Sequence, residues 1–206
     1  MSAETEIKAA PHGDYVGAKV GMWLFLVTEV LLFGGMFLLY SVFRSKYPQD
    51  FHEAAKELSV ALGAANTVIL LTSSLTMALS IGYLRSGKKK PSVLFQTATI
   101  LLGFAFLVNK YFEWGAKIQH GLYPDSPELL ALPKGEILFY GLYYVMTGLH
   151  GLHVIVGMII LSVLLVFTSK DIVNGHSFIK LENGGLYWHL VDLIWIYLFP
   201  LFYLIT

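Results

Sequence analysis

Five long apolar runs divide the chain, and polar connectors separate them. Each run is continuous, without alternation between polar and apolar positions, so it predicts a helix and not a barrel strand. A bilayer-spanning helix needs about 20 mainly apolar residues, and each run is long enough. The expected spans are residues 18–43, 60–84, 92–114, 137–168 and 186–205. The pattern predicts an all-α, polytopic membrane helix bundle with five transmembrane helices, forming a single membrane domain over residues 1–206.

Composition supports a membrane protein and excludes several classes of function. Of the 206 residues, 56% are hydrophobic and 14% are charged, and the mean hydropathy is +0.64. Soluble domains usually carry about 25% charged residues. The formal net charge is zero, which argues against a nucleic-acid partner because phosphate binding needs a basic surface. The chain has no cysteine, which excludes disulfides, iron–sulfur clusters and thiolate copper sites within it.

The connector after the second span indicates how the chain is oriented in the membrane. It carries Arg85, Lys88, Lys89 and Lys90 with no acid nearby. Short loops rich in lysine and arginine stay on the cytoplasmic side. Alternation of the spans then predicts a cytoplasmic N-terminus and a C-terminus outside.

Two local patterns mark expected helix ends. Pro91 suits the first position of a helix, so we expect the third helix to begin there. Tyr187 and Trp188 lie at the expected start of the fifth helix, where aromatic side chains favour the membrane–water interface.

Glu29 is an acid inside the first span, where a charge costs roughly 2.5–3.5 kcal/mol. Its helical neighbours Phe25, Leu26, Leu32 and Phe33 offer no hydrogen-bond partner. A partner must therefore come from another helix, a lipid headgroup or water. Both a packing role and a functional role remain open for this acid.

The second span carries a stripe of small polar residues. Asn66, Ser73 and Ser80 recur at seven-residue spacing, and Thr76 lies on the same side. Such a stripe could line a pore, but small polar residues in membrane helices more often allow close packing. We therefore expect close helix packing.

His150 and His153 stand one turn apart on the fourth span and share a face. They could form a metal site, a proton relay or polar packing. A metal would need a further ligand, for which Glu29 or His189 is a candidate. The chain lacks the repeated Glu-x-x-His pairs of di-iron bundles, so we assign no metal ligand. Three glycines around the histidines leave room for another helix, and we favour hydrogen bonding between helices or to a lipid.

Two further polar pairs lie within the spans. His189 and Asp192 are spaced i, i+3 on the fifth span, which predicts an ion pair or hydrogen bond between them. Glu113 follows Lys110 by the same spacing near the outer end of the third span. The simplest interpretation of this second pair is a structural contact.

Five motifs occur in order along the chain, namely "MWLFLVTEVLLFGGMF", "NTVILLTSSLTM", "YFE", "TGLHGLHVIVG" and "YWHLVDLIWIYLF". Through them the chain resembles subunit III of the haem–copper oxidases, the family of cytochrome c oxidase and ubiquinol oxidase. The resemblance implies a non-redox accessory subunit that packs against subunit I and accompanies subunit II, with haem and copper held in those partners. It also implies bound phospholipid, support for proton uptake during oxygen reduction, and protection of the active site during turnover.

The resemblance further implies where function resides. It assigns no catalytic residue, and it assigns lipid binding or support of proton uptake to Glu29, Glu113, His150, His153, His189 and Asp192. It implies a multi-pass protein of the bacterial plasma membrane within a respiratory complex, with a larger supercomplex as a further expectation. Long family members have seven helices and hold lipids between the first two and the rest. This chain matches the last five, so we expect that cleft to be incomplete or completed by another subunit.

Two alternatives remain. Lys110 and Trp114 in "KYFEW" are closer to short bacterial relatives, some of which accompany nitric oxide reductases. The chain could therefore be a homologous accessory subunit of a ubiquinol oxidase or nitric oxide reductase. An autonomous transporter is the second alternative, although five spans without internal repeats argue against it.

Overall fold

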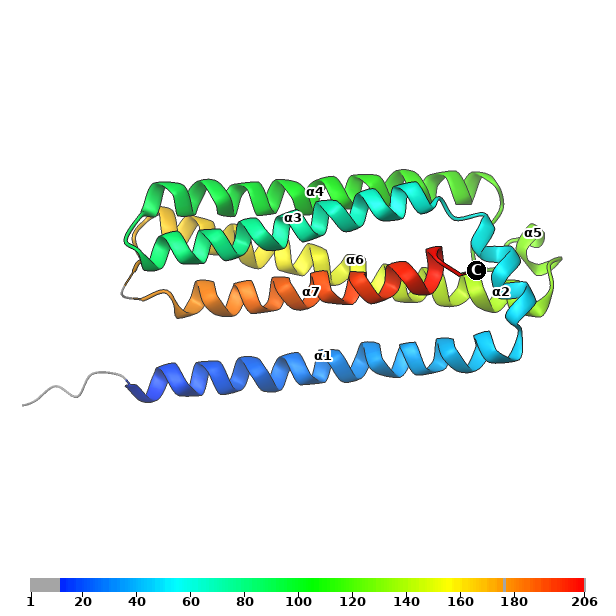
Figure 1. Cartoon of the computed structure of the whole chain (residues 1–206), viewed down its shortest axis with the longest axis horizontal. Coiled ribbons are helices and arrows are strands. Elements are labelled where there is room, and N and C mark those ends of the chain that lie inside the picture. The colour runs from blue at the N-terminus through cyan, green and yellow to red at the C-terminus, as the bar shows by residue number, and fades with distance from the viewer. Residues whose placement is uncertain (1–11, 176, 206) are drawn as a thin grey trace, which may run out of the picture.

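The computed structural model describes residues 12–175 and 177–205, and this part of the chain is entirely helical apart from its connectors. Five helices are long and apolar enough to cross a membrane, which confirms the predicted all-α bundle (Figure 1). They are α1 (His12–Lys46), α3 (Val60–Arg85), α4 (Lys89–Gln119), α6 (Lys134–Ser169) and α7 (Ile179–Tyr203).

Two short helices, α2 (Pro48–Lys56) and α5 (Pro127–Leu130), lie in connectors at the same end of the bundle (Figure 1). Each begins with proline, which suits the first helical turn because its missing N–H has no partner to lose there. Phe51 of α2 is fully buried and meets Tyr40 and Phe139 edge-on, with each pair of ring centroids 5.5 Å apart. The connector after α1 is therefore a packed part of the bundle.

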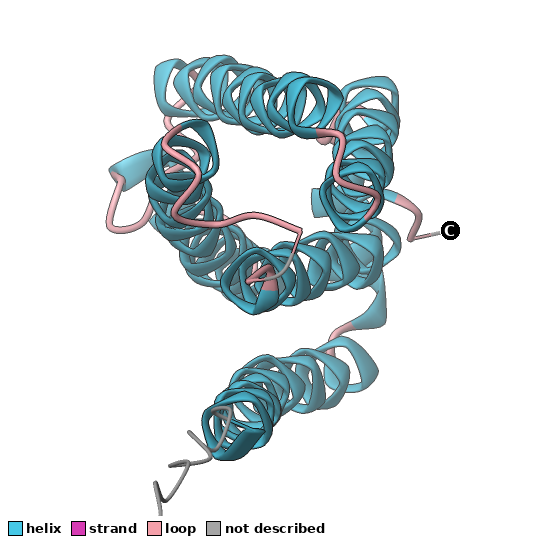
Figure 2. Cartoon of the chain, turned by 90° about the vertical axis from the view of Figure 1, so that its left-hand side faces the viewer, coloured by secondary structure: helices cyan, strands magenta, loops and turns pink. Residues whose placement is uncertain are grey.

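Four of the long helices surround a common core, and α1 lies to one side of them. Figure 2 shows α3, α4, α6 and α7 arranged as a ring when viewed along the bundle, with α1 outside it. The large apolar side chains on the outward side of α1, such as Leu24, Leu31 and Leu38, are exposed. Of the five spans, α1 has the fewest buried residues.

The helix boundaries correct two expectations. The third long helix begins at Lys89 and not at Pro91, so the proline occupies the third position. Its lack of an N–H is still tolerated there, because the N–H groups of the first turn have no helical partner. The last long helix begins at Ile179, seven residues before the expected start, since the polar "IKLENGG" stretch is helical.

Trp188 lies in the core of the bundle and not on its outer surface, where an interfacial aromatic side chain was expected. It is fully buried, and its indole Nε1–H donates to Ser73 Oγ at 3.0 Å. A Cβ added at Gly103 of α4 or Gly157 of α6 would lie 2.7 Å or 2.9 Å from its ring atoms. The ring therefore occupies a space that two glycines leave open between helices, whereas a Cβ at Gly151 would contact nothing.

Polar side chains join α3 to α4, as close packing predicts. These contacts are Asn66 with Asn109 at 2.9 Å, Thr76 with Thr99 at 2.8 Å, and Ser80 with Ser92 at 3.1 Å. Each satisfies polar groups inside the bundle that would otherwise be costly to bury in a membrane. The stripe on the second span is thus a helix contact.

Candidate functional site

Glu29 and His153 form a polar contact between α1 and α6, near the middle of both helices. The Glu29 carboxyl oxygen Oε2 lies 2.8 Å from His153 Nε2. The other ring nitrogen, Nδ1, lies 2.8 Å from the backbone oxygen of Leu149, one turn earlier in α6. The side chains are 15% and 12% exposed. The partner of Glu29 is therefore a side chain of another helix, which was one of the possibilities that the sequence left open. We call Glu29 and His153 the central pair.

Aromatic rings enclose the central pair. Phe33 of α1 meets the His153 ring edge-on at 5.3 Å, and Tyr187 of α7 stacks on it at 6.5 Å. Phe25 stacks in turn on Tyr187 at 6.0 Å. The Tyr187 hydroxyl donates to the backbone oxygen of His153 at 3.2 Å. The pair is therefore a polar contact in an apolar setting that joins three helices.

A groove of about 400 Å³ runs beside the central pair, between α1 and the α6–α7 pair. Phe25 and Tyr187 line it near the pair, and Lys180 and Asn183 line it at the beginning of α7. Asn183 also donates through Nδ2 to the backbone oxygen of Ala18, at 3.2 Å. The remaining lining is mainly apolar. This groove, which we call the α1 groove, is therefore polar at the beginning of α7 and apolar over the rest of its length.

His150 has surroundings quite different from those of His153. It is fully buried, with its ring perpendicular to Phe106 at 5.5 Å and tilted against Trp195 at 5.4 Å. Neither ring nitrogen has a hydrogen-bond partner among the described residues. The predicted hydrogen bonding between helices thus holds for His153, whereas His150 makes no such bond among the described residues. His153 therefore faces α1, whereas His150, one helical turn earlier in α6, faces the interior of the four-helix ring.

His189 and Asp192 do not pair with each other as predicted. His189 Nδ1 lies 2.6 Å from the Ser74 hydroxyl of α3. The Asp192 carboxyl is buried, and neither of its oxygens has a hydrogen-bond partner among the described residues. Ser74 of α3 therefore takes the place that the i, i+3 spacing predicted for Asp192 as the partner of His189. Both residues lie well inside α7, since this helix begins earlier than expected.

Lys110 and Glu113 do pair, and the contact is part of a closed buried network. Lys110 Nζ donates to Glu113 Oε2 at 3.0 Å, to the Tyr143 hydroxyl at 2.9 Å and to the Tyr203 hydroxyl at 3.0 Å. Both hydroxyls donate onward to Glu113 Oε1, at 2.8 Å and 2.6 Å. All three ammonium hydrogens are used, and the network connects α4 to α6 and α7. We call these four residues the Lys110 network.

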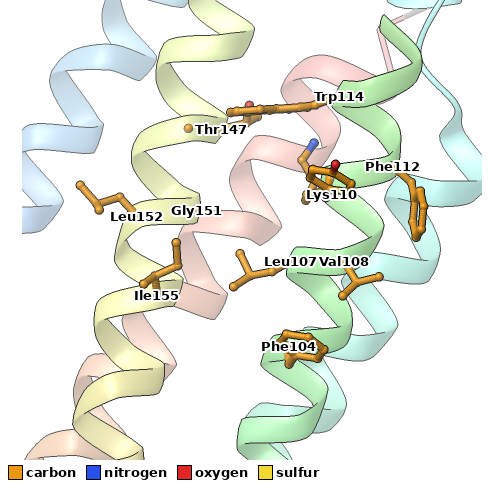
Figure 3. Close-up of a pocket in the computed structure, with 12 residues that line it drawn as sticks. Phe104, Leu107, Val108, Lys110, Phe112, Trp114, Thr147, Gly151, Leu152 and Ile155 are labelled. Atoms are coloured by element: carbon orange, nitrogen blue, oxygen red, sulfur yellow. The ribbon is translucent and has the colours of Figure 1, made fainter. Parts of the chain in front are cut away.

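A second, larger groove of about 780 Å³ lies between α4 and α6 (Figure 3). Phe104 and Leu107 line its α4 side, Leu152 and Ile155 line its α6 side, and Trp114 crosses one end. The sequence analysis did not identify this groove. Gly148 and Gly151 could have indicated it, because residues without side chains leave the surface of α6 that faces α4 flat.

Four of the six residues assigned to function from the sequence lie in inter-helix contacts, of three separate kinds. Glu29 and His153 meet between α1 and α6, Glu113 lies in the Lys110 network, and His189 of α7 contacts Ser74 of α3. Within residues 12–175 and 177–205, no group of three or more His, Cys, Asp or Glu side chains is placed to hold a metal ion. The described residues can therefore form hydrogen bonds between helices, and the α1 groove can hold a ligand that is polar at one end and apolar elsewhere.

The sequence is similar to that of a family of membrane proteins and to several of its members. Residues 7–206 match the family described as "Cytochrome c oxidase subunit III". The chain is 34% identical over 195 residues to "Cytochrome c oxidase subunit 3" of Synechocystis sp., covering 94% of this chain and 78% of that protein. It is 30% identical to "Probable quinol oxidase subunit 3" of Staphylococcus saprophyticus, covering 91% and 88%.

A third relative joins two subunits in one protein. The chain is 32% identical to "Heme-copper oxidase subunit I+III" of Aeropyrum pernix, covering 91% of this chain and 22% of that protein. A family match over almost the whole chain and relatives of similar length carry the assignment. With its five long apolar helices, the chain belongs to the subunit III family of the haem–copper oxidases, as a multi-pass membrane protein.

Proposed function

We propose that this chain is a non-redox accessory subunit that stabilises subunit I, binds phospholipid and supports proton uptake during oxygen reduction. The family to which it belongs carries no redox centre. Electron transfer and oxygen chemistry then take place on the haem and copper of partner subunits I and II. The A. pernix relative, named as subunit I+III, supports association with subunit I.

The α1 groove is the observation that carries the lipid proposal. Its volume of about 400 Å³ lies in the range of roughly 300–1,000 Å³ that single small ligands occupy. Lys180 at one end suits an anionic headgroup, and the apolar stretch toward Phe25 and Tyr187 suits an acyl chain. A phospholipid matches this order of charge and apolar surface.

The charge distribution supports a cytoplasmic location for the headgroup end. Ion pairs of Lys19 and Arg85 with Glu182, and of Lys89 with Asp171, gather the beginnings of α1, α4 and α7 at one end. The connector from α3 to α4 at this end carries Arg85, Lys88, Lys89 and Lys90 without an acid. Under the positive-inside rule this basic connector supports a cytoplasmic first end, and the proposed orientation has the N-terminus inside and the C-terminus outside.

Lipid retention in the purified oxidase complex tests the proposal. We expect Lys180→Ala to lower the amount of anionic phospholipid that remains bound, measured by native mass spectrometry, with subunit I still present. Lys134→Ala is the matched control, because Lys134 is an exposed lysine at the opposite end. Equal lipid content in Lys180→Ala, Lys134→Ala and the parent would refute the assignment of the α1 groove.

The electron donor is proposed to be cytochrome c. The S. saprophyticus relative, named as a probable quinol oxidase subunit, supports a quinol oxidase as the alternative. Identifying the subunits that co-purify with the chain, and the haem and copper they hold, separates these cases from a nitric oxide reductase. Substrate flux by the isolated chain in liposomes would instead support a transporter.

A further inference from the structure

The two contacts of His153 determine how many protons the central pair carries. A carbonyl oxygen only accepts hydrogen bonds, so the 2.8 Å contact between His153 Nδ1 and the Leu149 oxygen requires a hydrogen on Nδ1. The 2.8 Å contact between Nε2 and Glu29 Oε2 requires a second hydrogen on that line. The observed geometry therefore needs two protons on the pair.

Two protons leave the pair without net charge, in one of two forms. Either a carboxylic acid donates to a neutral imidazole, or an imidazolium donates to a carboxylate. In the second form the carboxylate would have a single donor, because Glu29 Oε1 has no hydrogen-bond partner among the described residues. Separated charges are also costly in an apolar setting unless further hydrogen bonds support them. The first form is favoured.

Among the residues that the structure describes, no charged group next to the central pair favours the imidazolium–carboxylate form over the carboxylic acid with a neutral imidazole. Tyr187 from α7 and His150 from α6 are the titratable side chains next to the pair, and both are uncharged hydrogen-bonding groups in their ordinary forms. On α1 the nearest cation is Lys19, ten residues earlier, or about 15 Å along the helix. Lys19 pairs with Glu182. A Glu29 carboxylate would thus have no cation among the described residues except His153 itself.

We propose that Glu29 is a carboxylic acid that donates to neutral His153, and that this uncharged pair positions α1 against α6. Leu149 fixes which ring nitrogen carries the histidine proton, so Nε2 is the acceptor. In this arrangement Glu29 and His153 are positioning residues that hold their protons. Because the pair lies at the inner end of the α1 groove, the consequence for lipid binding rests on the proposed function, whereas the proton arrangement does not.

Spectroscopy of the intact oxidase complex tests the proton arrangement. Nitrogen NMR with labelled histidine, assigned by difference from His153→Gln, should show a neutral ring with hydrogen on Nδ1 at pH 7. Infrared difference spectra should show a protonated carboxyl signal that disappears in Glu29→Gln. An imidazolium signal for His153, or a carboxylate signal for Glu29, would overturn the proposal.

Distance measurements test the positioning role. The chain has no cysteine, so spin labels can be attached at Leu24→Cys of α1 and Ile159→Cys of α6, both exposed positions. Glu29→Leu should shift or broaden the distance distribution, whereas Glu29→Gln should restore the parent distribution because its amide donates to Nε2. Thr28→Val is the matched control, since Thr28 is exposed and bonds only within α1.

The possible outcomes are distinct. A parent-like distance distribution in Glu29→Leu would show that the pair does not position α1. A changed distribution in both Glu29→Leu and Glu29→Gln would also overturn the proposal, because the amide should substitute for the acid. Parent-like distances in Glu29→Gln and Thr28→Val, with a shift confined to Glu29→Leu, would support it whether or not Lys180→Ala loses lipid.

Discussion

His150 illustrates how a polar residue can be prominent in a sequence without a polar role in the fold. Both ring nitrogens lack partners among residues 12–175 and 177–205, and the ring packs against Phe106 and Trp195 as an aromatic side chain would. Leaving a buried polar atom unpaired costs about 1–3 kcal/mol. His153, three residues later, has partners for both nitrogens. The two positions should therefore respond oppositely to an apolar replacement.

We expect His150→Phe to leave the free energy of unfolding unchanged or to raise it by about 1–3 kcal/mol, because it removes unpaired polar atoms. His153→Phe should lower the same quantity by about 0.5–1.5 kcal/mol, because it removes a hydrogen bond to another helix. Thermal unfolding of the complex measures both. Haem and copper per complex should stay at the parent value, and loss of either in His150→Phe would indicate a ligand role.

The Lys110 network makes a second prediction at this scale. Lys110→Met leaves the Glu113 carboxylate buried without its cation, which should lower stability by about 3–5 kcal/mol. Adding Glu113→Gln should recover much of the loss, because the uncompensated charge is then removed. The free energies of unfolding of the two single variants and the double variant form a double-mutant cycle. Additive losses would show that the two charges do not interact.

Close approach of helices is the feature that matters at the scale of elements. Trp188 of α7 occupies the space left by Gly103 of α4 and Gly157 of α6, where an added Cβ would lie within 3 Å of the ring. No real Cβ contact is that short, so a side chain at either position must push the helices or the ring apart. The position of α7 thus depends on glycines in two other helices.

We expect Gly157→Ala to lower stability by about 1–3 kcal/mol through overpacking against Trp188. Gly151→Ala is the matched control in the same helix, because its Cβ would meet open space. The control should be neutral or slightly stabilising, since alanine favours helix more than glycine does. Thermal unfolding compares the two, and equal effects would contradict the packing account.

The same elements show what the sequence could and could not predict. Continuous apolar runs identified all five long helices, because length and hydropathy are local properties. The contact between Glu29 and His153 joins residues 124 positions apart, so only the possibility of a partner helix could be predicted. The expectation that Trp188 lies near a helix end was wrong because the polar "IKLENGG" stretch hid the true start of α7. The pairing of His189 with Asp192 was predicted wrongly because spacing within one helix could not reveal Ser74 of α3 as the partner of His189.

For the whole molecule, orientation is the property with the most direct test. Ser86 and Ala131 are exposed and lie in connectors at opposite ends of the bundle. Ser126 would be a poor choice, since it is buried and its hydroxyl caps α5 by accepting from the Leu129 N–H. With no native cysteine, a single introduced thiol gives no background.

We expect Ala131→Cys to react with a membrane-impermeant thiol reagent in intact cells, because the proposed orientation puts its connector outside. Ser86→Cys should react only after the membrane is permeabilised, because basic loops remain cytoplasmic. The measurement is the extent of labelling before and after permeabilisation. The reverse pattern would invert the proposed topology.

The position of α1 outside the four-helix ring has a consequence for how the protein comes apart. Segments with few buried contacts open at lower free energy than the core, and they do so as units. α1 is held by its central pair, by contacts at its ends and by few buried apolar side chains. It should therefore exchange its amide hydrogens earlier than α3, α4, α6 or α7, and dock onto a ring already formed when the chain folds.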